Sequence, residues 1–346
     1  MGLLDGGRLA ARDTAQAEPI APSRARRRFP SISHIVSTHG LALLGLALIV
    51  IFSLVLPSTF PTDATLRGIL SDQIPVLFLA FGEMIVIACG QYDLSVGYGI
   101  GATSIIVVGL QVQSPHLAWP LAVLITIAAG LFIGLVNGLL VHHARINSFI
   151  ATLGTGYAVY SFSEWYTGGS QISGNLPSGF SALTGTVSGV PVPAICAVVV
   201  AIVLWLAFEY LPLGRYMYAL GSNERASELT GIPRGRYVIG AFMASGLMTG
   251  IAGVFVGSEL GVGQSNLGPE YLLPAFVGAL LGATTVRPGR VNVWGTCIAV
   301  LILAVGVSGL EQLGASFFVE PLFDGATLVL AVGLAGLVAR RRRHDT

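Results

Sequence analysis

The sequence contains few charged residues. Asp, Glu, Lys and Arg together make up 10% of the 346 residues, whereas 53% of the residues are hydrophobic. Soluble domains usually contain about 25% charged residues, because even a large core needs a charged surface around it. The eighteen basic residues are all arginine, since the sequence contains no lysine. This composition excludes an ordinary soluble domain and predicts an integral membrane protein.

Cysteine is also scarce, and its placement does not suggest metal binding. Cys89, Cys196 and Cys297 each lie inside an apolar stretch and are far apart in the sequence. Their spacing matches neither a zinc site nor a disulfide framework. We therefore expect three inert, buried thiols and no metal site.

Motifs that support catalysis are missing. The sequence contains no Gly-x-x-x-x-Gly-Lys-[Ser/Thr] phosphate loop, so the chain is not itself expected to hydrolyse ATP. It also contains no His-Glu-x-x-His run and no Ser/His/Asp grouping with a supporting context. These absences predict a chain with no catalytic residues and no bound cofactor of its own.

Apolar segments dominate the rest of the chain. A spanning helix needs about 20 mainly apolar residues, and membrane helices tolerate Gly and Pro. We therefore expect an all-α, polytopic membrane helix bundle of about ten transmembrane helices. The closely spaced pair 74–90 and 94–112 and the short segment 271–286 are candidates for broken or re-entrant helices. The ten segments are 39–57, 74–90, 94–112, 117–141, 148–167, 190–211, 237–259, 271–286, 292–310 and 321–338.

The placement of arginine predicts the orientation of the bundle. With the N-terminus inside, the outer loops contain only Arg67, and the inner loops and tails contain the other arginines. This asymmetry agrees with the positive-inside rule, so we expect both termini in the cytoplasm. No apolar signal-peptide core follows the first arginines. Residues 1–36 are expected to form a disordered cytoplasmic tail, 37–339 the transmembrane domain and 340–346 a basic cytoplasmic tail.

Polar residues inside the apolar segments are candidates for function. A charge near the middle of a lipid-exposed helix is costly, so Glu83 should face the bundle interior or a water-filled path. Glu83 could then line the path or bind backbone N–H groups at a broken helix. Asp93 resembles a helix N-cap more than a ligand. Asn137 is expected to bond across helices, and the repeat Gly130, Gly134, Gly138 favours close helix packing.

The longest inner loop, about 212–236, mixes Arg with Glu. Asn223 is a good N-cap, Glu224 suits a first helical turn, and Gly231 can end a helix. Arg225 and Glu228 could pair across one turn. We expect a short helix here that meets a cytoplasmic partner.

Four short blocks of sequence follow one another from about residue 75 to the C-terminus. They are GEMIVI from Gly82 with DLSVG from Asp93; FIATLG from Phe149 with TGG from Thr167; LGR from Leu213 with ALGSNERA from Ala219 and TGI from Thr230; and SG from Ser245 with AG from Ala252 and GALLGAT from Gly278. In this order the blocks resemble the ribose-type (monosaccharide) permease family of ATP-binding-cassette (ABC) importers. The sequence departs from the family pattern at Gln91, Tyr92 and Arg287–Arg290.

The resemblance implies the permease subunit of an ATP-driven importer in the bacterial inner membrane, which carries a monosaccharide or a related small polar solute. It implies an ABC ATPase subunit that binds ATP and Mg, an extracytoplasmic solute-binding protein, a second permease subunit, surrounding membrane lipid and no nucleic acid. The loop 212–236 would then couple to the ATPase. The coupling candidates are Gly221, Asn223, Glu224, Arg225, Ala226, Gly231 and Ile232. The translocation-path candidates are Glu83, Asp93, Ser95, Asn137 and Thr152.

Two other functions are compatible with this sequence. A branched-chain amino-acid permease has a similar layout, although the DLSVG run and the block at 219–232 favour the sugar-type family. An ion-coupled secondary transporter would need intramembrane acids that bind a proton or Na⁺, and Glu83 is the one strong candidate.

Overall fold

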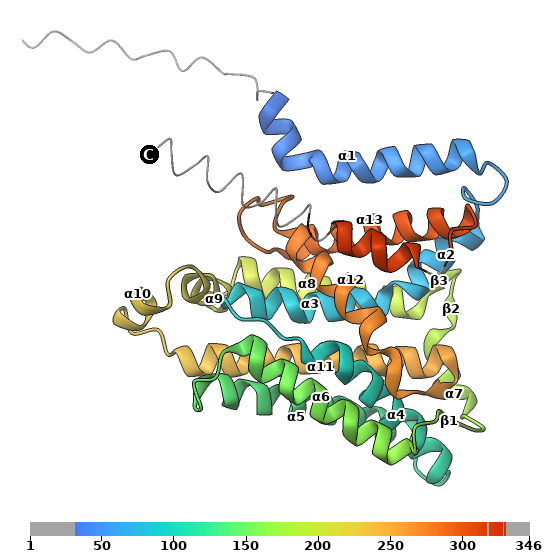
Figure 1. Ribbon diagram of the computed structural model, residues 1–346, viewed down its shortest axis with the longest axis horizontal. Helices are drawn as coiled ribbons and strands as arrows, with labels where there is room; N and C mark the ends of the chain where they lie inside the picture. Colours follow the sequence, from blue (N-terminus) through green and yellow to red (C-terminus); the bar gives the residue numbers. More distant parts are fainter. Residues whose placement is uncertain (1–31, 317, 328, 330–346) are drawn as a thin grey trace, which may run out of the picture.

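The computed structural model describes residues 32–316, 318–327 and 329. The long helices run roughly side by side, and short loops join them at two opposite ends of the molecule (Figure 1). We call the end that carries α9 and α10 the α10 end. The opposite end carries α7 and the short β-strands, and we call it the β end.

Helices account for nearly all of the regular structure in the described part of the chain. The helices are α1 (Ile32–Val55), α2 (Asp63–Asp72), α3 (Ile74–Ala88), α4 (Ser95–Gln113), α5 (Trp119–His142), α6 (Ser148–Thr167), α7 (Ser178–Ser181), α8 (Val192–Glu209), α9 (Pro212–Ser222), α10 (Glu224–Leu229), α11 (Arg234–Leu260), α12 (Gly268–Gly282) and α13 (Val293–Gln312). Residues 319–327 are also helical. Strand β1 (Ile172–Ser173) pairs antiparallel with β4 (Val262–Gly263), and β2 (Thr186–Val187) with β3 (Val190–Pro191).

The prediction of an all-α membrane protein is confirmed, whereas the count of ten spans is not. Five of the described helices, α4, α5, α8, α11 and α13, are long and apolar enough to cross a membrane. Helices α2 and α3 form a sixth span if the 42° bend between them is counted within one span. Helices α3 and α12 have 15 residues each, fewer than a straight span needs. The predicted tails and the segment 321–338 lie largely or wholly outside the described residues.

Glycine allows the central helix α11 to pack very closely against α5. A Cβ atom on Gly134 would lie 2.8 Å from the Phe242 carbonyl carbon and 3.0 Å from the Met243 Cα, and one on Gly138 would lie 2.8 Å from the Ile239 Cα. Because no side chain fits between the two backbones, the predicted glycine repeat is a helix-packing seam.

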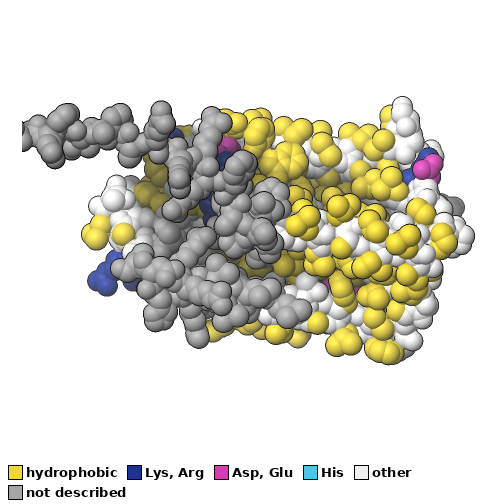
Figure 2. Space-filling view, turned by 90° about the horizontal axis from the view of Figure 1, so that it is seen from above, with side chains coloured by type: hydrophobic (Ala, Val, Ile, Leu, Met, Phe, Trp, Pro, Cys, Tyr) yellow, Lys and Arg dark blue, Asp and Glu magenta, His cyan; other side chains and the backbone are white. Residues whose placement is uncertain are grey.

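Charged residues gather at the two ends of the bundle. The inner-loop arginines predicted from the sequence lie at the α10 end, where Arg287 pairs with Glu209. At the β end, the Gln312 side chain donates a hydrogen bond to Thr65, and β1 pairs with β4. Hydrophobic side chains cover most of the described surface between the ends (Figure 2), as a membrane environment requires.

Candidate functional site

The buried polar site is organised by the break between α3 and α4. Helix α3 ends at Ala88, and Gly90 then adopts a positive φ of 74° that glycine tolerates well. The chain stays non-helical until α4 begins at Ser95. The predicted interruption between the two segments is therefore present.

Asp93 caps the start of α4, as predicted, but it lies two residues before the first helical residue, Ser95, and not directly before it. Its Oδ1 atom accepts a hydrogen bond from the Ser95 backbone N–H at 3.1 Å and from the Ser95 hydroxyl at 2.6 Å. The residue directly before α4 is Leu94, whose side chain makes no cap. Asp93 thus satisfies a backbone donor that the break would otherwise leave unpaired.

Side chains from α5 and α6 complete this group. The Asn137 amide donates to the Ser95 Oγ at 2.7 Å and to the Asp93 Oδ1 at 3.4 Å, and its own oxygen accepts from the Thr155 hydroxyl. The Leu94 backbone N–H donates to the Thr152 Oγ1 at 3.0 Å. Asn137 therefore bonds across helices, as predicted. We call Glu83, Asp93, Ser95, Asn137, Thr152 and Thr155 the break network.

Glu83 is the least satisfied member of the break network. It is fully buried, and its Oε2 atom accepts one long hydrogen bond, 3.5 Å, from the Asp93 backbone N–H. Within the described residues, its Oε1 atom has no hydrogen-bond partner. Burying a polar group without a partner costs free energy, so this side of the network is its weakest part.

The structure brings all five predicted path residues into one cluster, and every one of them is buried. Sequence reasoning did not identify Thr155 or Ser148, whose Oγ atom accepts from the Tyr92 backbone N–H at 3.2 Å. A signal for both was present. Ser148, Thr152 and Thr155 repeat at helical spacing along one face of α6, and that face turns toward the break.

The second candidate site is the helix pair α9–α10 at the α10 end. The Asn223 Oδ1 atom accepts from the Ala226 backbone N–H at 3.0 Å, so the predicted N-cap is confirmed. At the other end of α10, Gly231 has a φ of 84°. Its N–H donates to the Glu228 carbonyl, and the Ile232 N–H donates to the Ser227 carbonyl. This pair of bonds is the Schellman motif, so Gly231 ends the helix as predicted.

The charges around α10 pair differently from the prediction. Glu224 forms an ion pair with Arg234, at 2.6 Å, and the ion pairs of the described residues do not include Arg225 with Glu228. The ion pair joins the start of α10 to the start of α11 and closes the loop between them. Leu229, at the end of α10, is 87% exposed, and α10 itself lies at the outer edge of its end of the molecule (Figure 1).

An open groove of about 780 Å³ lies beside α10. Its lining combines cationic or titratable side chains with apolar ones and includes His142, His143, Glu228, Ile232, Pro233 and Arg236. The coupling candidate Ile232 thus borders a concave surface, whereas Leu229 forms a projecting one. A partner protein with one projecting side chain and one pocket could bind the groove and Leu229 at the same time.

Helix α9 rests directly on the end of α3. A Cβ atom on Gly221 would lie 3.0 Å from the Gly90 nitrogen and closer still to the Ala88 carbonyl oxygen. Conversely, a Cβ atom on Gly90 would lie 3.1 Å from the Gly221 Cα. The coupling candidate Gly221 therefore contacts the same helix break that the buried network secures.

A polar clamp holds the other side of α9. The Arg287 guanidinium forms two bonds to the Glu209 carboxylate, and Arg290 lies 3.8 Å from the same carboxylate. Arg290 also stacks over the Tyr218 ring at 4.7 Å, and the Tyr218 hydroxyl donates to the Val291 carbonyl at 2.8 Å. Burial raises the pKa of Tyr218, which keeps this donor protonated. Sequence reasoning treated these arginines as markers of topology and missed the clamp.

Comparison with known proteins identifies similar chains over most of the sequence. A family profile described as "Branched-chain amino acid transport system / permease component" matches residues 65–332. The chain is 33% identical over 291 residues to the ribose import permease protein RbsC of Bacillus subtilis (strain 168), which covers 84% of this chain and 90% of the relative. It is 32% identical over 294 residues to RbsC of Escherichia coli (strain K12), with 83% and 90% covered.

A third relative carries a different cargo in its name. The autoinducer 2 import system permease protein LsrD of Escherichia coli (strain SMS-3-5 / SECEC) is 31% identical over 268 residues, which cover 76% of this chain and 81% of the relative. No solved structure matches the chain.

Proposed function

The chain belongs to the family of permease components of branched-chain amino acid transport systems, and on that premise we propose that it is the membrane-spanning permease subunit of an ATP-driven importer. Its cargo is a monosaccharide or a related small polar solute. The resemblance predicted from the four sequence blocks agrees with the family and with the ribose import permeases. The transmembrane domain spans about residues 37–339, with the arginine-rich tails in the cytoplasm.

The relatives decide between the sugar-type function and the amino-acid alternative. The family description names branched-chain amino acids, whereas the relatives are named as ribose and autoinducer 2 import permeases. Ribose import permeases are about one-third identical to this chain over four-fifths of its length. A sugar-type cargo is therefore favoured.

The observation that carries the proposal is the construction of α9–α10. This helix pair is capped at Asn223, ended by the Gly231 motif and closed by the ion pair between Glu224 and Arg234. It presents Leu229 to the surroundings on one side and contacts the α3–α4 break through Gly221 on the other. A rigid element with one free face and one face on a helix break suits the transfer of motion from an ATPase to the membrane domain.

We place the steps of coupling as follows. Movement of the ATPase subunit shifts α10 as a rigid body, and α9 moves with it because one residue, Asn223, separates the two helices. Gly221 then pushes on Gly90, and the displacement reaches Asp93 three residues later. The hydrogen bonds of the break network then rearrange to fit the displaced backbone, and Glu83 is its most weakly bonded member. In this proposal, the five path candidates form and exchange the hydrogen bonds that fix the backbone of the α3–α4 break.

The same proposal assigns the remaining partners. The α10 end lies in the cytoplasm, since its arginines follow the positive-inside rule. The β end faces outward and receives an extracytoplasmic solute-binding protein. A second permease subunit completes the membrane domain, as the resemblance to the importer family implies.

Reconstitution tests this function directly. The chain is purified with its ATPase subunit, placed in proteoliposomes with the solute-binding protein, and assayed for uptake of radiolabelled D-ribose. We expect uptake that requires ATP and stops when the ATPase subunit is omitted. Uptake of leucine in place of ribose would support the amino-acid alternative. Uptake driven by an ion gradient without the ATPase would contradict the proposal.

A further inference from the structure

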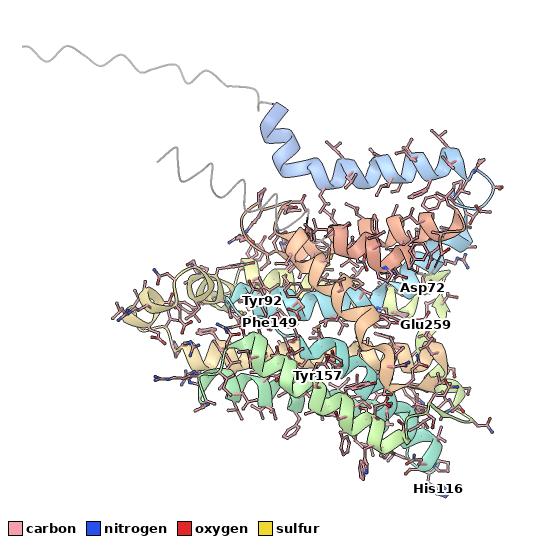
Figure 3. The ribbon with its side chains drawn as sticks, in the orientation of Figure 1. Asp72, Tyr92, His116, Phe149, Tyr157 and Glu259 are labelled. Atoms are coloured by element: carbon pink, nitrogen blue, oxygen red, sulfur yellow. The ribbon has the colours of Figure 1, made fainter. Side chains whose placement is uncertain are left out.

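Tyrosines gather on one surface of the bundle next to the break network. Tyr92 lies in the α3–α4 break, Tyr98 in the first turn of α4, and Tyr157 and Tyr160 in α6. The Tyr98 ring centroid lies 5.0 Å from that of Tyr157 and 5.9 Å from that of Tyr160. The four residues form what we call the tyrosine strip. Figure 3 shows Tyr92 toward the α10 end and Tyr157 near the middle of the bundle.

The tyrosine strip is open to its surroundings. Tyr92 is 41% exposed and Tyr157 is 53% exposed, whereas Tyr98 and Tyr160 are half-buried behind them. The strip is one layer away from the break network, because a Cβ atom on Gly156 would lie 2.7 Å from the Tyr98 ring and 3.3 Å from the Ser95 Cα. The neighbouring Thr155 bonds to Asn137. Thus exposed hydroxyls lie directly outside the buried polar cluster.

The depth of the strip is unusual for tyrosine. Tyr157 lies nine residues after Ser148, which is about 14 Å along the helix at a rise of about 1.5 Å per residue, so it sits at the middle of the 20-residue helix α6, which packs beside the spanning helices α4 and α5. Tyrosines in membrane proteins usually lie at the two interfaces instead. The Tyr98 and Tyr157 side chains interact through a hydrogen bond, and lipid offers no partner for the remaining donor and acceptor capacity of the two hydroxyls.

Helix α8 shows what a lipid-facing surface of this chain looks like. Around its middle, the exposed residues are Val198, Val199, Ile202 and Val203, which are all aliphatic. The exposed face around the middle of α6 carries Tyr157, the bare backbone of Gly154 and Ala158. The two faces therefore meet different environments.

We propose that the tyrosine strip contacts the transported solute and that the solute is rich in hydroxyl groups. The aromatic rings offer apolar faces to the C–H surfaces of a sugar, and the phenol groups donate and accept hydrogen bonds with its hydroxyls. A second copy of the permease covers this face and keeps lipid away from it. This inference rests on the proposed function and adds the residues that recognise the cargo.

Accessibility to water tests the strip independently of transport. In a background in which the three native cysteines are replaced by alanine, Tyr157→Cys and the control Val199→Cys are treated in proteoliposomes with a membrane-impermeant maleimide. The control is matched, since Val199 is 55% exposed at the middle of α8. Only a thiol in contact with water forms the reactive thiolate, so Tyr157→Cys should react at least about tenfold faster. Equal, slow labelling at both positions would overturn the proposal.

Uptake of D-ribose by variants that keep native cysteines tests contact with the solute. Tyr157→Phe should lower uptake about threefold and Tyr157→Ala about tenfold, because the first removes a hydroxyl and the second also removes the ring. Val199→Ala should leave uptake unchanged. Unchanged uptake in both tyrosine variants would contradict solute contact even if the position is labelled. If the parent chain shows no ATP-dependent uptake, the proposed function fails, and the labelling result still decides whether the strip faces water.

Discussion

The α10 end and the β end of the bundle manage charge in opposite ways. All ion pairs of the described residues lie at the α10 end, where Glu224 binds Arg234 and Glu209 binds Arg287 and Arg290. The described part of the β end carries an excess of carboxylates, among them Asp63, Asp72, Glu164, Glu259, Glu270, Glu311 and Glu320, and one arginine, Arg67. Asp72 and Glu259 lie near each other there (Figure 3).

This difference suggests that the two ends perform different work. At the α10 end, ion pairs join the start of α10 to the start of α11 and the end of α8 to the α12–α13 loop, and they hold these segments relative to one another. Such an end can transmit a displacement without deforming. At the β end, the carboxylates stay available, so the field of this end attracts a partner that carries basic residues. We expect close packing to determine function at the α10 end, and long-range electrostatic attraction to determine it at the β end.

The largest effect on uptake is expected at the close backbone contact between Gly221 and Gly90. Gly221→Val places a branched side chain against Gly90 and the Ala88 carbonyl, so α9 must separate from the break. We expect D-ribose uptake to fall more than about tenfold while the complex still hydrolyses ATP, since the ATPase itself is unchanged. The control is Gly325→Val, because a Cβ atom there has no neighbour within 4 Å and the position lies outside α9 and α10. Coupled uptake in the Gly221→Val variant would show that this contact does not carry the motion.

The next effect concerns the end of α10. Gly231→Val forces a β-branched residue into the left-handed region, which costs about 1–2 kcal/mol or more and disrupts the Schellman motif. We expect uptake to fall several-fold and ATP hydrolysis to lose its dependence on the solute-binding protein. Gly231→Asn is the matched variant, since asparagine tolerates this backbone conformation. Its uptake should stay close to that of the parent chain; an equal loss in both would refute a role for helix termination.

A moderate effect is expected at the β end. The triple variant Asp72→Asn, Glu259→Gln, Glu270→Gln removes three exposed charges without changing the size of the side chains. We expect affinity for the solute-binding protein to fall about threefold to tenfold at low salt, with the difference disappearing at high salt. Surface plasmon resonance over a salt series measures this. A loss that is independent of salt would contradict the electrostatic role.

The smallest effect is expected for the polar clamp on α9. Glu209→Gln removes the charge that Arg287 and Arg290 share, but all three side chains are partly exposed. Solvent screening limits such pairs to about 1 kcal/mol or less. The melting temperature in detergent should therefore drop by only a few degrees, with uptake reduced less than in the Gly221→Val variant. A larger loss of uptake than of stability would assign the clamp to coupling.

Local features of this fold could be predicted from the sequence. The Asn223 cap and the Gly231 terminus depend on residues within one helical turn, so a single short segment contains the whole signal. The break before α4 was predicted for the same reason, since only residues 91–93 separate the apolar segments 74–90 and 94–112. The all-α class followed from composition. Glycine packing followed from the i,i+4 spacing in α5.

Features that join distant segments could not be predicted in the same way. The polar residues of the break network were each identified, but nothing in the sequence states that Asn137 meets Ser95, 42 positions earlier. The contact between Gly221 and Gly90 and the pairing of Glu209 with Arg287 depend on the packing of helices that are far apart in sequence. The number of spans is not confirmed for a related reason, because short helices and bends, such as the bend between α2 and α3, depend on tertiary packing.

The glycine seam between α5 and α11 limits which parts of the molecule can rearrange. At Gly130 and Gly134 the nearest atoms of α11 are backbone atoms, which have no rotamer to change, so these contacts hold the two helices at a fixed distance. They form a fixed reference frame through the middle of the bundle. Any cycle of shape change then has to be confined to the helices on either side of this frame, and backbone amides of α11 should exchange with deuterium more slowly than those of α3 and α4 in every state of the cycle.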